Sequence, residues 1–179
     1  MQKGMLTKVA LGLLAVGGAM VVIALAPGIG AALKMIDPNP RKAMDKLERA
    51  MRRLSKDGSI EAGPGKRYRL TTFGTRKLAR LQFNDLSFTK PKRPWDGRWR
   101  LVCFDIPETE QYVRRLFQSK LSELGFYRLQ NSVFVYPYEC GDFLALANRA
   151  FELQDHVRLV LAEKIDNEAK LLAFFRLAR

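Results

Sequence analysis

The sequence is poor in the side chains that most metal and redox chemistry requires. Its 179 residues include two cysteines, Cys103 and Cys140, and one histidine, His156. Two cysteines provide neither a disulfide framework nor a four-ligand zinc site. One histidine excludes centres that depend on several imidazoles. Cys103 stands in an apolar run, which predicts a buried core thiol.

Acidic residues are scarce in the first half of the chain. Residues 1–97 contain 19 Lys and Arg against 7 Asp and Glu, a net charge of +12. Residues 98–179 contain 12 against 11, a net charge of +1. A strongly basic segment favours a polyanionic partner, and both duplex DNA and an anionic membrane present dense phosphate. The hydrophobic content of 47% argues against a disordered chain.

Residues 9–33 form the longest uncharged segment. Their length and flanking lysines fit a membrane span. Pro27 and five glycines interrupt the segment, which disfavours a continuous span. We therefore interpret it as two short buried helices, over 5–17 and 19–35, in a cytoplasmic protein. A membrane-anchored binding protein that uses residues 9–26 as its anchor is an alternative.

Residues 37–81 are predicted to form a helix, a hairpin and a second helix. Asn39 and Pro40 predict the start of a helix over residues 40–56. Gly58 predicts its end. Apolar residues at spacings of 3 and 4 give this helix one apolar stripe: Met44, Leu47, Met51 and Leu54. A Gly-Pro-Gly turn at 63–65 predicts a hairpin, and Thr71 is suited to cap a helix through Leu81. This order is typical of a winged helix-turn-helix.

In this interpretation, helix 40–56 enters the major groove of duplex DNA and the hairpin lies beside the phosphate backbone. Residues 34–93 contain 17 Lys and Arg against 6 Asp and Glu. A solvated basic face without a partner is the alternative. The predicted DNA-binding residues are Arg49, Arg52, Arg53 and Lys56 on the helix, and Lys66, Arg67 and Arg69 on the hairpin.

A proline-punctuated basic segment at 85–97 predicts a linker between a domain at 1–84 and another at 98–179. The second domain has predicted strands at 98–106, 126–129, 132–136 and 156–162, and predicted helices at 108–124 and 139–153. The order βαββαβ is the split-βαβ, ferredoxin-like arrangement. The predicted fold class is therefore α+β, with an N-terminal winged helix-turn-helix and a C-terminal ferredoxin-like domain.

Motifs in the second domain resemble two known families. These are Phe104-Asp105-Ile106-Pro107-Glu108, Leu124-Gly125-Phe126 and Gln130-Asn131-Ser132-Val133-Phe134. They are similar to the small ferredoxin-like CRISPR-associated adaptation protein. They are also similar to the phenylacetate-degradation repressors (PaaX), in which a winged helix precedes such a domain. The segments 95–100 and 133–137 resemble PaaX more closely. The PaaX resemblance implies a DNA-binding homodimer, joined through residues 98–179, that regulates transcription and requires no cofactor.

The resemblance to the adaptation protein implies a different role for Asp105. It matches a strand-terminal aspartate that resembles a metal ligand at a homodimer interface. Two such carboxylates across a two-fold axis would share one Mg²⁺ and activate a water. Asp105 would then be the catalytic and metal-binding residue of a Mg²⁺-dependent nuclease, or belong to an adaptation subunit with an adaptation partner. The structural alternative is that Asp105 caps the following helix.

Overall fold

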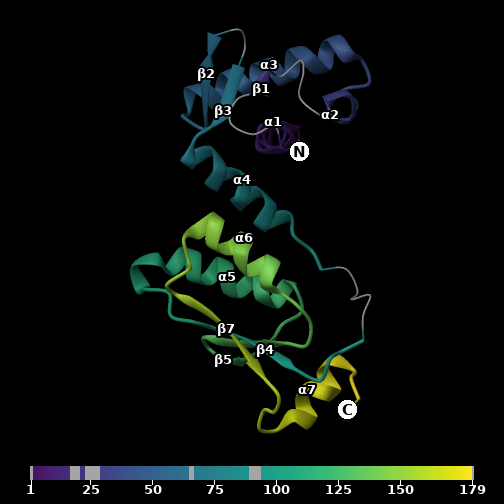
Figure 1. Ribbon diagram of the computed structural model, residues 1–179, viewed down its shortest axis with the longest axis vertical. Coiled ribbons are helices and arrows are strands. Elements are labelled where there is room, and N and C mark those ends of the chain that lie inside the picture. Colours follow the sequence, from purple (N-terminus) through teal and green to yellow (C-terminus); the bar gives the residue numbers. More distant parts are fainter. Residues whose placement is uncertain (1, 17–20, 23–28, 65–66, 89–93, 179) are drawn as a thin grey trace. The chain divides into compact units, whose positions relative to one another are not determined.

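The computed structural model describes residues 2–16, 21–22, 29–64, 67–88 and 94–178, and it divides the chain into two units (Figure 1). Unit 1 is Met1–Leu81 and unit 2 is Gln82–Arg179. Each combines helices with an antiparallel sheet, so the fold is α+β as predicted. Among the described residues, no helix has the length and apolar character needed to cross a bilayer.

Unit 1 contains three helices and a three-stranded sheet, followed by a fourth helix that crosses the unit boundary. In chain order the elements are α1 (Gln2–Val16), β1 (Val21–Val22), α2 (Ile29–Ile36), α3 (Pro40–Lys56), β2 (Ile60–Gly63), β3 (Arg67–Leu70) and α4 (Thr72–Asp85). The strand order is β1-β3-β2, with both pairs antiparallel. The predicted helix 40–56 and the predicted hairpin are therefore present.

The predicted helix over 19–35 is wrong in part. Val21 and Val22 form strand β1, which pairs with Tyr68 and Arg67 of β3, and α2 begins only at Ile29. β-branched valines favour an extended backbone. Residues 17–20 and 23–28 lie outside the described residues, so much of the proposed anchor at 9–26 does as well.

The apolar N-terminal helix is part of the core of unit 1. Leu6, Leu11 and Leu14 of α1 are buried in one cluster with the apolar stripe of α3. Leu11 and Leu47 are both fully buried. Burying a leucine side chain stabilises a fold by about 1.5–3 kcal/mol. The apolar character of α1 is thus accounted for by packing inside unit 1.

Unit 2 contains the predicted order βαββαβ and one further helix. The elements are β4 (Trp99–Phe104), a 3₁₀ turn η3 (Glu108–Glu110), α5 (Gln111–Glu123), β5 (Tyr127–Gln130), β6 (Val133–Tyr136), α6 (Gly141–Phe151), β7 (Val157–Ala162) and α7 (Glu168–Phe175). The strand order is β5-β6-β4-β7, and every pair is antiparallel. Strands β4 and β5 are joined through α5 yet separated by β6. Helix α7 was not predicted.

Helices α5 and α6 cover one face of this sheet (Figure 1). Phe104 of β4 packs edge-on against Phe117 of α5, which stacks on Phe143 of α6 at 5.7 Å between ring centroids. On the opposite face, Trp99 and Val135 are buried with Leu171 of α7. Cys103 lies on that same face, beyond this cluster, and is only half-buried. The expectation of a fully buried Cys103 is therefore wrong.

Candidate nucleic-acid interface

The start of helix α3 is set by the local sequence. Asn39 Oδ1 accepts hydrogen bonds from the backbone N–H of Arg41 at 3.0 Å and of Lys42 at 3.3 Å. Pro40 takes the first helical position, where its missing N–H costs nothing. At the other end, Gly58 has a φ of +76°, a conformation that favours glycine. The helix thus begins and ends as the capping residues predict.

Helix α3 separates its side chains into an apolar and a basic face. The apolar face, with Leu47, Met51 and Leu54, is buried in the core of unit 1. The opposite face is exposed. We call it the basic face, and its residues are Arg41, Lys42, Asp45, Arg49, Arg52, Arg53 and Lys56. Six cations and one carboxylate on one side of a helix give a surface that suits a polyanion.

Four of the predicted DNA-binding residues lie together on this face: Arg49, Arg52, Arg53 and Lys56. Two further cations, Arg41 and Lys42, belong to the same face and were not among the predicted site residues. At 3.6 residues per turn, Arg41 lies about 20° from Arg52 around the helix axis, and Lys42 about 20° from Arg49. Helical periodicity alone would therefore have placed Arg41 and Lys42 on this face from the sequence.

The hairpin of β2 and β3 carries the remaining predicted residues. Arg67 is exposed, whereas Arg69 forms an ion pair with Glu61 of β2 at 2.5 Å. Lys66 lies outside the described residues. The charge of Arg69 is therefore partly neutralised within the hairpin, and Arg67 is its more available cation.

A hydrogen-bonded junction holds the base of the hairpin against α3 and α4. Asp57 accepts hydrogen bonds from Ser59 and forms an ion pair with Lys77 of α4 at 2.5 Å. Burial opposes ionisation of Asp57, but these bonds outweigh it and lower the pKa of the carboxyl below its ordinary value. Thr71 Oγ1 donates toward the carbonyls of Gly58 and Ser59 and accepts from the N–H of Gly74. The junction orients the hairpin relative to the basic face.

Asp105 lies at the end of β4 and is exposed. Its backbone N–H donates to the carbonyl of His156 at 2.8 Å, and its carbonyl lies 3.0 Å from His156 Nδ1. The turn that follows has no side-chain capping bond at its N-terminus. Among the described residues, no cluster of three or more His, Cys, Asp or Glu side chains is placed to hold a metal ion.

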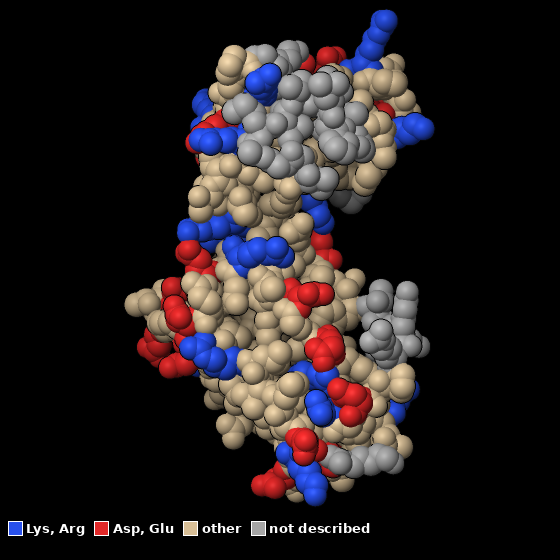
Figure 2. Space-filling view, in the orientation of Figure 1, with Lys and Arg blue, Asp and Glu red and all other residues tan. Residues whose placement is uncertain are grey.

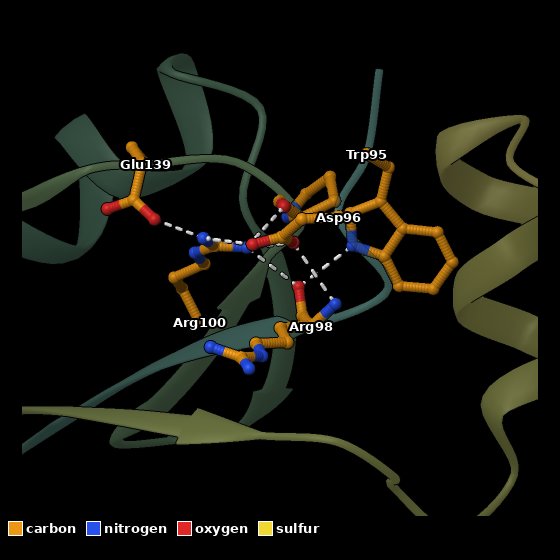
Figure 3. Close-up of polar contacts among 6 residues, drawn as sticks. Trp95, Asp96, Arg98, Arg100 and Glu139 are labelled. Atoms are coloured by element: carbon orange, nitrogen blue, oxygen red, sulfur yellow. Dashed lines mark hydrogen bonds and ion pairs between the residues drawn. The ribbon is translucent and has the colours of Figure 1, made fainter. Parts of the chain in front are cut away.

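The side chain of Arg100 organises the entry to unit 2 (Figure 3). Although 4% exposed, it donates to both carboxylate oxygens of Asp96, at 2.6 and 2.8 Å, and to Glu139. It also donates to the carbonyl oxygens of Arg98 and Pro137. Hydrogen bonds from Arg100 hold the pKa of Asp96 at about 2. The carboxylates in turn raise the pKa of the guanidinium, although burial opposes this.

Glu139 also lines an open pocket of about 720 Å³ in unit 2, together with Gln82, Phe88, Asp142 and Arg149. The buried thiol of Cys140 is part of its wall, and burial raises the pKa of this thiol to about 12. On the face of unit 2 that Figure 2 shows, acidic and basic side chains are interspersed.

Comparison with protein families identifies the second half of the chain. Residues 92–172 match the family model of the PaaX protein central Cas2-like domain. No curated protein matches the chain. The match covers the elements from β4 through most of α7 and includes Arg100 with its partners Asp96 and Glu139. It confirms the PaaX resemblance. Residues 92–172 are therefore similar to the central Cas2-like domain of PaaX proteins.

Proposed function

We propose that the protein is a PaaX-like transcriptional regulator that binds duplex DNA as a homodimer. The observation that carries the proposal is the basic face of α3, on which six Lys and Arg side chains are exposed along one helix. Phosphate neutralisation by such a face supplies much of the affinity for DNA. The PaaX-type domain in the same chain supports a regulatory role.

The arrangement of unit 1 supports a winged helix. Its elements run α1-β1-α2-α3-β2-β3, and the hairpin follows α3 directly. In this assignment α2 and α3 form the helix-turn-helix, α3 is the recognition helix in the major groove, and β2 and β3 are the wing. Arg67 lies on the wing, where it would contact phosphate.

We assign unit 2 as a ferredoxin-like dimerisation domain. Its βαββαβ order with β6 inserted between β4 and β5 supports the fold. Strand β7 lies at the sheet edge and exposes three consecutive apolar residues: Leu159, Val160 and Leu161, at 39%, 45% and 57%. Exposed apolar edge strands are prone to pair with another chain. The occupant we propose is β7 of a second copy, which would pair with this edge.

The proposal is tested by fluorescence anisotropy of full-length protein with random-sequence duplex DNA across a salt series. The wild type is expected to bind tightly at low salt and to weaken steeply as salt rises. The triple variant Arg49→Gln/Arg52→Gln/Arg53→Gln is expected to lower the slope of log K against log salt by about three per protomer.

The matched control changes three exposed cations of unit 2, Arg115→Gln/Lys164→Gln/Lys170→Gln, and should keep the wild-type slope. Equal loss in both variants, or no wild-type binding at low salt, would contradict the assignment. Mg²⁺ is included and the DNA is recovered for sizing. If the wild type shortens the DNA and Asp105→Ala leaves it intact, the protein would instead be identified as a nuclease.

A further inference from the structure

One carboxylate interrupts the basic face of α3. With 3.6 residues per turn, Asp45 lies within roughly 40° of Arg41, Arg49, Arg52 and Lys56 around the helix axis. It is exposed and belongs to the second turn of the helix, which begins at Pro40. In helix-turn-helix proteins, the N-terminal residues of the recognition helix contact base edges. Asp45 therefore occupies a position from which base edges are read.

An internal ion pair does not account for Asp45. Arg49, four residues later, directs its Nε to the backbone carbonyl of Asp45 at 3.2 Å rather than to the carboxylate. Arg52 lies 3.8 Å from Glu48. Within the described residues, the carboxylate of Asp45 accepts no hydrogen bond and forms no ion pair.

The other acidic side chains of unit 1 behave differently. Asp37 pairs with Lys46 at 2.7 Å, Asp57 with Lys77 at 2.5 Å and Glu61 with Arg69 at 2.5 Å. Glu48 is the partner of Arg52. Asp45 is thus the exception among the acidic residues of unit 1, and it is the one placed at the centre of the basic face.

A carboxylate at this place opposes phosphate binding, because like charges repel. It therefore weakens sequence-independent affinity, and a hydrogen bond to a base edge would compensate for this loss. In the major groove cytosine presents its N4 amino group as a donor, and an aspartate is a suitable acceptor. Guanine N7 and O6 and thymine O4 are acceptors and offer the carboxylate no hydrogen bond. Adenine offers its N6 amino group, but the acceptor N7 beside it disfavours a carboxylate.

We propose that Asp45 determines sequence specificity by accepting a hydrogen bond from the N4 amino group of a cytosine in the major groove. The inference rests on the proposed function, because it requires α3 to be the recognition helix. The surrounding arginines then supply affinity, and Asp45 selects among the bases that the helix meets.

The test is selection from a randomised duplex library with full-length protein, followed by sequencing, for wild type, Asp45→Ala and Glu48→Gln. The wild type is expected to enrich a motif with cytosine at one fixed position, favoured roughly tenfold to hundredfold. Asp45→Ala should lose the preference at that position alone and bind random DNA more tightly. Glu48→Gln removes the same charge from the same helix and should leave the motif unchanged.

A second measurement isolates the amino group. Replacing the selected cytosine by 2-pyrimidinone, which lacks the amino group, should weaken the wild type and leave Asp45→Ala unaffected. An unchanged motif in Asp45→Ala overturns the inference while the proposed function stands. Absence of any wild-type binding at low salt overturns the proposed function and the inference together. Circular dichroism checks that Asp45→Ala, an exposed helical substitution, remains folded.

Discussion

The residue that most clearly links sequence to structure in unit 2 is Arg100. A guanidinium buried to this extent requires partners for its donors, because an unpaired buried charge is costly. Asp96 accepts two parallel hydrogen bonds from the guanidinium. Arginine is suited to this geometry and lysine is not. The arginine thereby fastens the chain entering β4 to the loop that leads into α6.

Asp96→Asn is expected to lower the free energy of unfolding of unit 2 by about 1–2 kcal/mol at pH 7, after allowance for the half-exposed carboxylate. The pKa of Asp96 is about 2 in the folded protein and higher when unfolded, with an ordinary value of 3.8. The stabilisation is therefore complete above about pH 4 and is lost as the pH falls toward 2. The difference between variant and wild type should vanish over this window.

Tryptophan fluorescence during urea unfolding at several pH values measures this difference. Both tryptophans of the chain, Trp95 and Trp99, lie in unit 2, so the signal reports on that unit. Asp155→Asn, an exposed aspartate of the same unit, is the control and should have no such effect. A difference between Asp96→Asn and wild type that is as large at pH 2 as at pH 7 would contradict the role of the charged pair.

At the scale of elements, the base of the hairpin depends on the close approach of α4. A Cβ added at Gly74 would lie 1.9 Å from the backbone carbonyl oxygen of Ser59. That oxygen also accepts the N–H of Thr71, so the backbone there is constrained. Gly74 therefore lets the first turn of α4 lie against the hairpin.

Gly74→Ala is expected to destabilise unit 1 by about 1–3 kcal/mol or more, because backbone must move to admit the methyl group. Gly12→Ala, in α1 with nothing within 4 Å of the added carbon, should instead be neutral or stabilise by up to about 1 kcal/mol. Hydrogen exchange of the backbone amides in the β2–β3 segment measures the stability of unit 1 in both variants. Equal protection in the two variants would contradict the close contact.

The sequence predicts some elements well because their determinants are local. Helix α3 has a cap, an N-terminal proline, a regular apolar stripe and a terminal glycine, all within about 20 residues. Strand β1 has no such determinants, because two valines in a long apolar run become a strand only through pairing with β3. Helix α7 has eight residues and is stabilised by packing on Trp99 and Val135.

The same distinction applies to the candidate site. Four of the seven predicted DNA-binding residues lie on one face because helical periodicity alone determines that face. The ion pair of Arg69 with Glu61 depends on the register of β2 with β3, which composition does not reveal. The sequence likewise does not predict that Asp45 lacks an ion pair, because this depends on where Arg49 and Arg52 direct their side chains.

For the whole molecule, the division of charge separates two tasks. Unit 1 has 16 Lys and Arg against 5 Asp and Glu, a net charge of +11, and unit 2 has 15 against 13, a net charge of +2. The proposed DNA contacts and the proposed dimer contacts fall on these different units. Self-association of unit 2 is therefore not opposed by strong like charge. Dimerisation would double the number of basic faces that engage one duplex.

Val160→Asp is expected to convert the proposed dimer to a monomer, because it places a charge on the exposed edge strand β7. Sedimentation equilibrium measures the mass, and the slope of log K against log salt for DNA binding should fall to about half. Tyr112→Asp replaces a side chain of α5 that is 76% exposed and should leave both quantities unchanged. A dimer that survives Val160→Asp would exclude this interface.

The packing of α1 has a consequence for synthesis on the ribosome. Leu11 and Leu14 are made early, yet Leu78, which belongs to the same core, follows more than sixty residues later. At about 5–20 residues per second, this interval lasts roughly 3–12 seconds. During it α3 is made and can pack on α1, but the core of unit 1 is still incomplete. The apolar residues of α1 are thus available to chaperones and targeting factors before unit 1 is complete.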